Sequence, residues 1–249
     1  MLKIRIIPIL TFNGWSLVKT KRFSNPRIVG NPVQAARVYN SRGVDELIFL
    51  DIFASKQKRK INSKIVKDVI DECFMPVGIG GGISSISDIN DMLKIGADKV
   101  ILKTVALLNP TFLKEASYFF GSQCISVSVD VFQDEDGVYM IYNEFGIKIS
   151  MNDFIKKIQD LGAGEIILNS VEKDGTMEGF DCLMYSKAHE VTTLPIVCVG
   201  GGGNMLHYER LFTKTNCEAV GSASIFHFTQ HTPLDIKNIL KNLGKPVRV

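Results

Sequence analysis

The sequence lacks an apolar run long enough to cross a membrane, because its hydrophobic residues (45%) and charged residues (22%) are interspersed along the chain. It also lacks room for a secretory leader, since a strand-like segment begins within about three residues of Met1. From these two absences we expect a cytoplasmic protein that has no membrane partner.

Metal and disulfide motifs are missing as well. The five cysteines are odd in number and include no CxxC pair, and the four histidines show no metal-ligand spacing. This pattern favours a reduced compartment, and we expect neither a metal nor another cofactor. The net charge of +3 is too small to indicate a nucleic-acid partner, and the one dense basic run, residues 56–60, is typical of a solvated loop.

One pattern is present twice. Residues 75–84 read MPVGIGGGIS and residues 194–204 read LPIVCVGGGGN, so each is an apolar run that ends in a glycine cluster. The backbone N–H groups of such a cluster, together with a following helix N-terminus, can bind an anion that a Cβ would keep away. Two clusters predict a ligand with a phosphate at each end, although a tight turn without a ligand would give the same pattern.

The repeat extends through both halves of the chain. GVDELIFLDI (43–52) is echoed by GAGEIILNSV (162–171), and GADKVILKT (96–104) is echoed by CEAVGSAS (217–224). The offset is close to half of the 249 residues, which indicates two copies of one half.

Eight strand–helix units of roughly 30 residues follow one another, and their strands are apolar throughout. This order predicts a single domain over residues 1–249, a (β/α)8 TIM barrel with a half-barrel internal repeat. A doubly wound open sheet is the alternative, which the half-chain repeat disfavours. Two segments exceed what a connection needs: residues 11–30, a candidate lid, and residues 131–149, an expected inserted hairpin.

Polar residues end several of the predicted strands, where a barrel carries its active site. Asp130 ends an otherwise apolar strand, and a carboxylate there is costly unless it is paired or functional, so it is our catalytic candidate, with a hydrogen-bonding anchor as the alternative. Asp51 is a second candidate, for catalysis or substrate contact or for anchoring its loop. The half-chain offset from Asp130 falls on Thr11, which is not a titratable partner for an acid–base pair.

Charged residues stand at the opposite, N-terminal ends of four predicted strands. Two of each sign would neutralise one another as a ring of salt bridges around the barrel axis, which gives a polar gate at the bottom of the barrel. Ordinary solvated strand ends are the alternative. The four residues are Arg5, Glu46, Lys99 and Glu165.

Ten short stretches carry a family resemblance over the whole chain. They are RIIP (5–8), VK (18–19), VDELIFLDIFAS (44–55), GGGI (80–83), GADKV (96–100), FGSQCI (120–125), LGAGEI (161–166), DGT (174–176), ASIFHF (223–228) and PVRV (246–249). Together they resemble the HisF family, the cyclase subunit of imidazole glycerol phosphate synthase. The resemblance implies a lyase that takes ammonia from a separate glutaminase and uses it to cleave and cyclise a bisphosphorylated substrate, giving imidazole glycerol phosphate and AICAR in histidine biosynthesis.

The resemblance also assigns roles to residues. The four charged residues match the family's gate at the ammonia entrance, Asp130 matches one of its two catalytic aspartates, and Lys19 matches the lysine of its flexible loop. Asp45 and Asp98 match the rim where the glutaminase, a HisH-like subunit, docks. The residues that we expect to bind phosphate are Gly81, Gly82, Lys103, Thr104, Asp174, Gly202, Gly203, Ser222 and Ser224.

Three positions depart from the family. Thr11 stands where the family has its other catalytic aspartate, Lys103 stands where it has asparagine, and Asn169 stands where it has threonine. The segment LVKTKRFSNPRIVGNP (17–32) instead resembles a HisF-like paralogue group associated with acetamidino modification of surface sugars. Those proteins also pair with a glutaminase-like subunit and hand ammonia to a sugar amidotransferase.

The four gate residues match the family, while Thr11 replaces one of its two catalytic acids. This combination favours ammonia delivery through the barrel with altered chemistry at the catalytic face. We therefore expect a paralogue that serves polysaccharide biosynthesis and acts on a phosphorylated small molecule. The authentic cyclase subunit of histidine biosynthesis is one alternative, and a non-catalytic scaffold for a glutaminase complex is another. The chain has no Gly-x-Cys-x-Gly nucleophile motif, so its ammonia must come from another protein.

Overall fold

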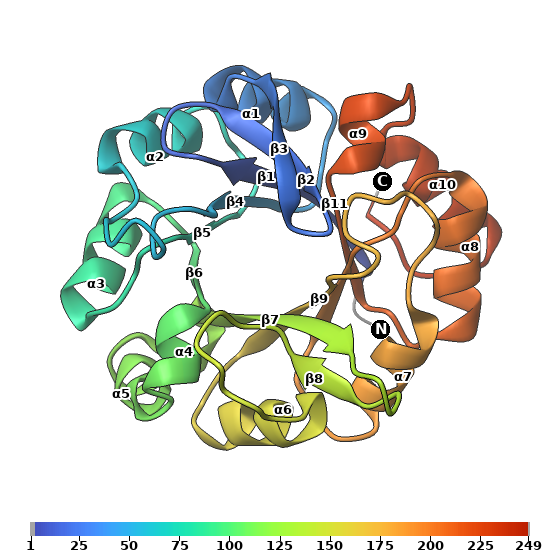
Figure 1. The fold of residues 1–249 in the computed structure, drawn as a ribbon. Helices are drawn as coiled ribbons and strands as arrows, with labels where there is room; N and C mark the ends of the chain where they lie inside the picture. Colours follow the sequence, from blue (N-terminus) through green and yellow to red (C-terminus); the bar gives the residue numbers. More distant parts are fainter. Residues whose placement is uncertain (1–2, 249) are drawn as a thin grey trace.

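The computed structural model describes residues 3–248, in which eight parallel strands close into a barrel. The closing pair is β1 (Arg5–Phe12) with β11 (Ala219–Ser222). Between them run β4 (Leu47–Asp51), β5 (Val77–Gly80), β6 (Lys99–Leu102), β7 (Ile125–Gln133), β9 (Glu165–Ser170) and β10 (Ile196–Val199). The predicted (β/α)8 barrel is confirmed, and the open-sheet alternative is wrong because β1 pairs with β11 (Figure 1).

Helices surround the barrel (Figure 1). They are α1 (Pro32–Ser41), α2 (Ser63–Ile70), α3 (Ile86–Ile95), α4 (Thr104–Leu108), α5 (Thr111–Phe120), α6 (Met151–Asp160), α7 (Cys182–His189), α8 (Met205–Lys214), α9 (Ser224–Phe228) and α10 (Pro233–Asn242), with a short 3-10 turn at Ser122–Cys124. The five-residue helices α4 and α9 are additional to the pattern predicted from the sequence. They follow β6 and β11, which occupy equivalent places in the two halves.

The helix ends follow from local chemistry. The Asn31 side chain accepts hydrogen bonds from the first backbone N–H groups of α1, and Pro32 occupies a first-turn position that needs no donor. At α3, Ser85 and Asp88 form a capping box, and Gly96 ends the helix in the left-handed region at φ 116°. These capping interactions determine at which residue each helix begins or ends, and therefore where the chain enters the next strand.

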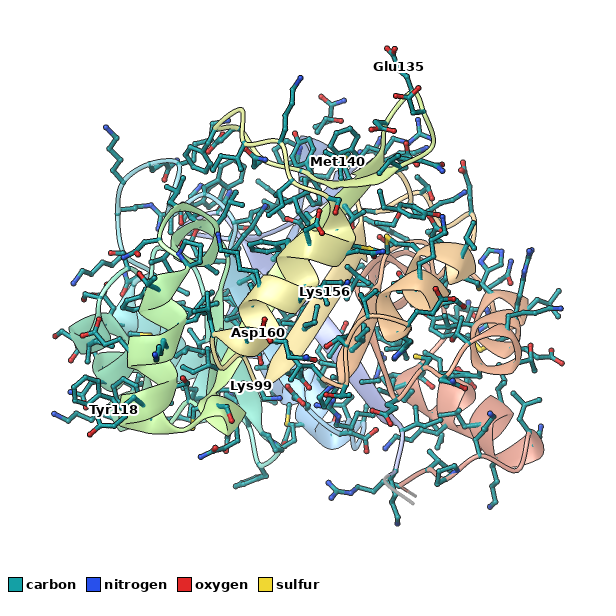
Figure 2. All side chains as sticks on the ribbon, turned by 90° about the horizontal axis from the view of Figure 1, so that it is seen from below. Lys99, Tyr118, Glu135, Met140, Lys156 and Asp160 are labelled. Atoms are coloured by element: carbon teal, nitrogen blue, oxygen red, sulfur yellow. The ribbon has the colours of Figure 1, made fainter. Side chains whose placement is uncertain are left out.

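Two antiparallel additions extend the barrel beyond its strands. The segment predicted as a lid loop contains a hairpin of β2 (Leu17–Lys21) and β3 (Ser24–Gly30). In the second half, β8 (Tyr139–Ile141) pairs with the extended end of β7. Figure 2 shows Glu135 and Met140, from the second addition, at one end of the barrel and Lys99 near the other. We call these the upper and lower ends, and the strands run from lower to upper.

The core has two parts. One lies between the strands and the helices, and the other fills the barrel itself with Ile7, Ile9, Ile48, Ile101, Ile167, Val197 and Ala219. The first and last described segments meet at the lower end, where the Ile4 N–H donates to the Pro246 carbonyl over 2.9 Å. Within residues 3–248, no helix combines the length and apolarity that crossing a bilayer requires. An apolar layer therefore separates the polar groups at the two barrel ends.

Candidate active site

The lower end of the barrel carries a closed ring of salt bridges. The Arg5 guanidinium lies 2.8 Å from a Glu46 carboxylate oxygen and 2.6 Å from a Glu165 oxygen. The Lys99 ammonium lies 2.9 Å from an oxygen of each of the same two glutamates. Both glutamates are buried, so they are not ordinary solvated strand ends. The four charged side chains cross the axis of the barrel at the height where its strands begin.

Burial and pairing act against each other in this ring. Burial opposes ionisation of Glu165, but the charges and hydrogen bonds of Arg5 and Lys99 outweigh burial and lower the pKa of the Glu165 carboxyl. For Arg5, burial disfavours the charged form, while Glu165 and Glu46 raise the pKa of the guanidinium above its usual value. The ring is therefore held by paired charges that depend on one another.

The two aspartates expected at the docking rim differ in exposure. Asp45 is buried, and its carboxylate accepts hydrogen bonds from Lys237 Nζ over 3.0 Å and from the Ile6 N–H over 2.9 Å. Asp98 is exposed at the lower end and uses one oxygen to accept from the Val77 N–H over 2.8 Å. Asp45 thus fastens β1 to α10, and only Asp98 presents a carboxylate to the surface.

A pocket with a volume of about 440 Å³ opens at the upper end. It brings together nearly all of the residues that the sequence singled out for chemistry. They are Thr11, Lys19, Asp51, Gly81, Gly82, Lys103, Thr104, Asp130, Asn169, Asp174, Gly202, Ser222 and Ser224. Gly203 lies one residue beyond the lining, and its N–H donates to His207 Nδ1 over 3.3 Å. The pocket is large enough for a small phosphorylated molecule.

Asp130 is buried in the lining of this pocket, and both of its carboxylate oxygens have partners. One oxygen accepts from the Asn169 amide over 3.2 Å, and the other forms an ion pair with the ammonium of Lys103. A carboxylate in such a pair must lose or share its partner before it accepts a proton. Lys103, which the sequence assigned to phosphate binding, therefore contacts the catalytic candidate.

Thr11 has a structural contact. Its hydroxyl donates to the Val18 carbonyl, and this bond joins the end of β1 to the start of the β2–β3 hairpin. A threonine hydroxyl does not titrate near neutral pH, so Asp130 faces no second carboxylate from this strand. The Thr11 side chain therefore positions the β2–β3 hairpin and supplies no second acid.

Lys19 holds the hairpin over the pocket. Its ammonium lies 2.8 Å from a carboxylate oxygen of Asp174, and both side chains are buried. The Arg22 N–H adds a hydrogen bond of 2.9 Å to the Asp174 carbonyl. Asp174, expected among the phosphate ligands, thus pairs with the hairpin lysine.

Asp51 anchors its own loop. Its carboxylate accepts from the N–H groups of Phe53 and Ala54, over 3.2 Å and 3.1 Å, and forms an ion pair with Arg59. These bonds fold residues 52–59 back across the end of β4. They match the loop-anchoring alternative, although Asp51 still lines the pocket.

The first glycine cluster is shaped by close backbone contacts. A Cβ at Gly82, where φ is +66°, would lie 2.2 Å from the Arg59 carbonyl, and one at Gly81 would lie 2.7 Å from the Asp51 carbonyl. No other residue fits here without moving the neighbouring loop. The second cluster is equally tight, since a Cβ at Gly203 would lie 2.3 Å from the Met177 carbonyl.

Two residues that line the pocket, Phe23 and Tyr142, were not among the predicted site residues. Phe23 of the hairpin places its ring 5.5 Å from the ammonium of Lys103 and 5.4 Å from the ring of Tyr142. Arg59, outside the pocket lining, was also not predicted, and it forms an ion pair with Asp51. Their sequence neighbourhoods resemble mobile loops, so only the fold reveals that they meet at the pocket.

A closed barrel with a polar pocket at the carboxyl ends of its strands is the architecture of (β/α)8-barrel enzymes. A family profile described as "Histidine biosynthesis protein" matches residues 5–232. The chain belongs to the HisF family.

Relatives align with the chain from end to end. The imidazole glycerol phosphate synthase subunit HisF of Streptococcus mutans is 42% identical over 251 residues, covering 100% of both chains. The HisF subunit of Staphylococcus carnosus is 40% identical, covering 100% of this chain and 99% of the relative. The Clostridium botulinum subunit is 37% identical, again over 100% of both chains. The similarity thus includes both ends of the barrel.

Proposed function

We propose that this chain is the ammonia-using subunit of a HisF-like synthase, with the two barrel ends dividing the work. Ammonia arrives at the lower end through the ring of Arg5, Glu46, Lys99 and Glu165, and it is used in the pocket at the upper end. The observation that carries the proposal is the closed ring at the lower end of the barrel whose upper end holds the pocket. Ordinary packing does not require four mutually dependent charges on a barrel axis.

The partner in this proposal is a HisH-like glutaminase at the lower face. The chain supplies no glutaminase nucleophile of its own, and its relatives are named as synthase subunits. Asp98 is the exposed carboxylate beside Lys99, so it is suited to pair with a basic residue of the partner. Passage of ammonia requires one ion pair of the ring to open.

The acceptor is a phosphorylated small molecule in the upper pocket. One phosphate is held by Gly81, Gly82 and Thr104, and the other by Gly202, Gly203 and Ser224. Each glycine cluster precedes a helix, so backbone N–H groups and the positive end of the helix dipole favour an anion at each place. Asp130 then serves as proton acceptor once Lys103 moves to the ligand.

We further propose that the chain is the paralogue that supports acetamidino modification of surface sugars through a sugar amidotransferase. The threonine at position 11, where the resemblance implies an acid, and the ion pair between Lys103 and Asp130 support altered chemistry at the upper end. Segment 17–32, which carries the resemblance to that group, folds into the hairpin that covers the pocket.

The second candidate is the authentic cyclase subunit of histidine biosynthesis. It is favoured by full-length identities of 37–42% to subunits named HisF. Release of AICAR from the histidine-pathway bisphosphate in ammonium buffer separates the two candidates. The paralogue gives a rate far below that of an authentic cyclase subunit, and the second candidate gives an equal rate.

The shared part of the proposal is tested by mixing the purified chain with a HisH-like glutaminase from the same source. We expect a complex and a faster hydrolysis of glutamine. If no complex forms and glutamine hydrolysis is not faster, the proposed role in ammonia transfer is wrong, and only the proposed binding of a phosphorylated molecule in the upper pocket remains.

A further inference from the structure

A hydrogen bond between two buried hydroxyl groups lies behind the second glycine cluster. Tyr208 of α8 is fully buried, and its hydroxyl lies 2.8 Å from the Oγ of Ser222, the last residue of β11. The same tyrosine hydroxyl packs against the backbone at Gly202, where a Cβ would approach it to 2.4 Å. Gly202 and Ser222 line the pocket, whereas Tyr208 is not part of its lining. Tyr208 can therefore act on a bound ligand only through these two residues.

The first half of the barrel has an apolar pair at the equivalent positions. Ile89 is the fourth residue of α3, as Tyr208 is of α8. Leu102 is the last residue of β6, as Ser222 is of β11. Ile89 and Leu102 are both buried. One half of the barrel thus fills these positions with apolar side chains, so packing alone does not require the two hydroxyl groups of the other half.

The donor in the hydrogen bond follows from the burial of the phenol. Burial raises the pKa of Tyr208, so its hydroxyl keeps its proton near neutral pH. Ser222 is its one side-chain partner within residues 3–248. If Ser222 donated, the phenolic proton would be buried without an acceptor, which is costly. Tyr208 therefore donates to Ser222, and the serine proton is left to point into the pocket.

The bond from Tyr208 prepares Ser222 to bind an anion. Accepting from the phenol polarises the serine hydroxyl and strengthens the hydrogen bond that it donates in turn. A phosphate dianion offers acceptors and no donor, so it needs neighbouring groups whose protons point at it. Ser222 meets this need at the place where Gly202 also lines the pocket.

We propose that Tyr208 is a positioning residue that holds the Ser222 hydroxyl as a donor to the phosphate bound at Gly202 and Gly203. This role rests on the proposed function, because the phosphate at this loop is itself part of that proposal. Tyr208 does not touch the ligand, so its effect on binding passes through Ser222. The first phosphate loop lacks this arrangement, because its equivalent pair carries no hydroxyl group.

The test measures phosphate binding at each loop separately. Inorganic phosphate is titrated into the isotope-labelled chain in slightly alkaline buffer, where phosphate is a dianion, and the backbone amide signals are followed by NMR. The amides of Gly202 and Gly203 report on the second loop, and those of Gly81 and Gly82 report on the first. The first loop is an internal control, because no tyrosine–serine pair lies behind it.

Four variants are compared with the wild-type chain: Tyr208→Phe, Ser222→Ala, the double variant of both, and Tyr185→Phe. The last is the matched control. It also removes the hydroxyl of a fully buried tyrosine, but this hydroxyl donates to the Val199 carbonyl over 2.6 Å and not to a proposed phosphate ligand. Thermal unfolding establishes that each variant is folded.

We expect Ser222→Ala to weaken phosphate binding at the second loop about tenfold, because a hydrogen bond to a charged group is worth about that factor. Tyr208→Phe should weaken it about threefold, because the serine hydroxyl remains but is no longer held and polarised. In the Ser222→Ala background, Tyr208→Phe should have no further effect, since it acts only through the serine. Tyr185→Phe should leave both loops unchanged, and no variant should alter binding at the first loop.

Three results would overturn the positioning role and leave the phosphate loops standing. They are unchanged binding in Tyr208→Phe, an equal loss in Tyr185→Phe, and an effect of Tyr208→Phe that persists in the Ser222→Ala background. Phosphate binding at the first loop alone would overturn the positioning role together with the second phosphate site. Binding at neither loop would overturn the phosphate sites of the proposed function.

Discussion

The two ends of the barrel use charged residues in opposite ways. At the lower end, each charged group of the ring contacts two groups of opposite sign, and the glutamates are buried. At the upper end, three acids each pair with one separate base: Asp51 with Arg59, Asp130 with Lys103, and Asp174 with Lys19. A shared ring resists change at any one member, whereas separate pairs can be altered singly.

This difference fits what the family resemblance leads us to expect. From the resemblance we expect the four ring residues to match the family and Thr11, Lys103 and Asn169 at the upper end to depart from it. A substitution in the ring leaves buried charges without partners, which costs several kcal/mol. A substitution in the pocket changes one acid–base pair and leaves the other two pairs in place.

The largest expected effect comes from an acid at position 11, where the resemblance to the family implies one. Thr11→Asp adds a second carboxylate to the pocket that Asp130 lines, and loss of one member of an acid–base pair costs about 10²–10⁴-fold in rate. We therefore expect release of AICAR from the histidine-pathway bisphosphate, in ammonium buffer, to rise by up to that factor. Adding Asp130→Asn to the same variant should remove the gain. A gain that survives Asp130→Asn would show that the two positions do not act as a pair.

The next effect breaks the ring at the lower end. Glu165→Leu leaves Arg5 and Lys99 with one glutamate between them, and removing one partner of a buried pair costs about 3–5 kcal/mol of unfolding free energy. Urea denaturation followed by circular dichroism measures the change. Glu72→Gln is the control, because the Arg37–Glu72 pair is solvent-exposed and its loss should have a far smaller effect. Equal losses in the two variants would refute the distinction between ring and surface pair.

A third comparison, between Gly82 and Gly146, separates two costs of replacing a glycine: the strain of a positive φ and the steric clash of an added Cβ. Gly82 and Gly146 have similar φ angles, +66° and +71°, but a Cβ meets the Arg59 carbonyl at 2.2 Å only at Gly82. Gly146→Ala should cost about 1 kcal/mol for its positive φ, and Gly82→Ala should cost about 1–3 kcal/mol more. Thermal unfolding and inorganic phosphate binding are the measurements. Equal stability and equal phosphate binding in the two variants would contradict the assigned loop.

The smallest effect is the pH dependence of the ring. The pKa of Glu165 is lowered in the folded chain, because Arg5 and Lys99 outweigh the effect of burial, so its ionised form stabilises the fold. This contribution is complete above the unfolded pKa of about 4.3 and disappears as the pH falls through the lower folded value. The difference in unfolding free energy between the wild-type chain and Glu165→Gln should therefore be constant from pH 7 to 5 and shrink below pH 4.5. A constant difference down to pH 3 would contradict the lowered pKa.

The barrel and its polar ends were predictable from the sequence because both depend on periodic patterns. Apolar strands, glycine clusters and the half-chain repeat predicted the barrel, and strand-end positions placed Asp130 in the pocket and Glu46 and Glu165 in the ring. Strand direction alone decides which end of a parallel barrel a residue occupies.

The partners of individual side chains were not predictable in the same way. Lys103 was assigned to phosphate but contacts Asp130, and Asp45 was assigned to docking but is buried against Lys237. The segment predicted as a lid loop forms a hairpin whose Phe23 reaches Lys103. These contacts join residues that lie 27 to 192 positions apart, and no local pattern specifies them.

In the proposed complex, a glutaminase binds the lower end of the barrel while the upper end remains free for the acceptor. Figure 2 places Glu135 at the upper end, and Asp98 precedes Lys99 at the lower end, so Asp98→Lys and Glu135→Lys make the same charge reversal on opposite faces. The measurement is the dissociation constant of the complex with the HisH-like glutaminase, by calorimetry. We expect Asp98→Lys to weaken the complex about tenfold or more and Glu135→Lys to leave it unchanged. Weakening by Glu135→Lys with no effect of Asp98→Lys would place the partner at the upper end and contradict the account.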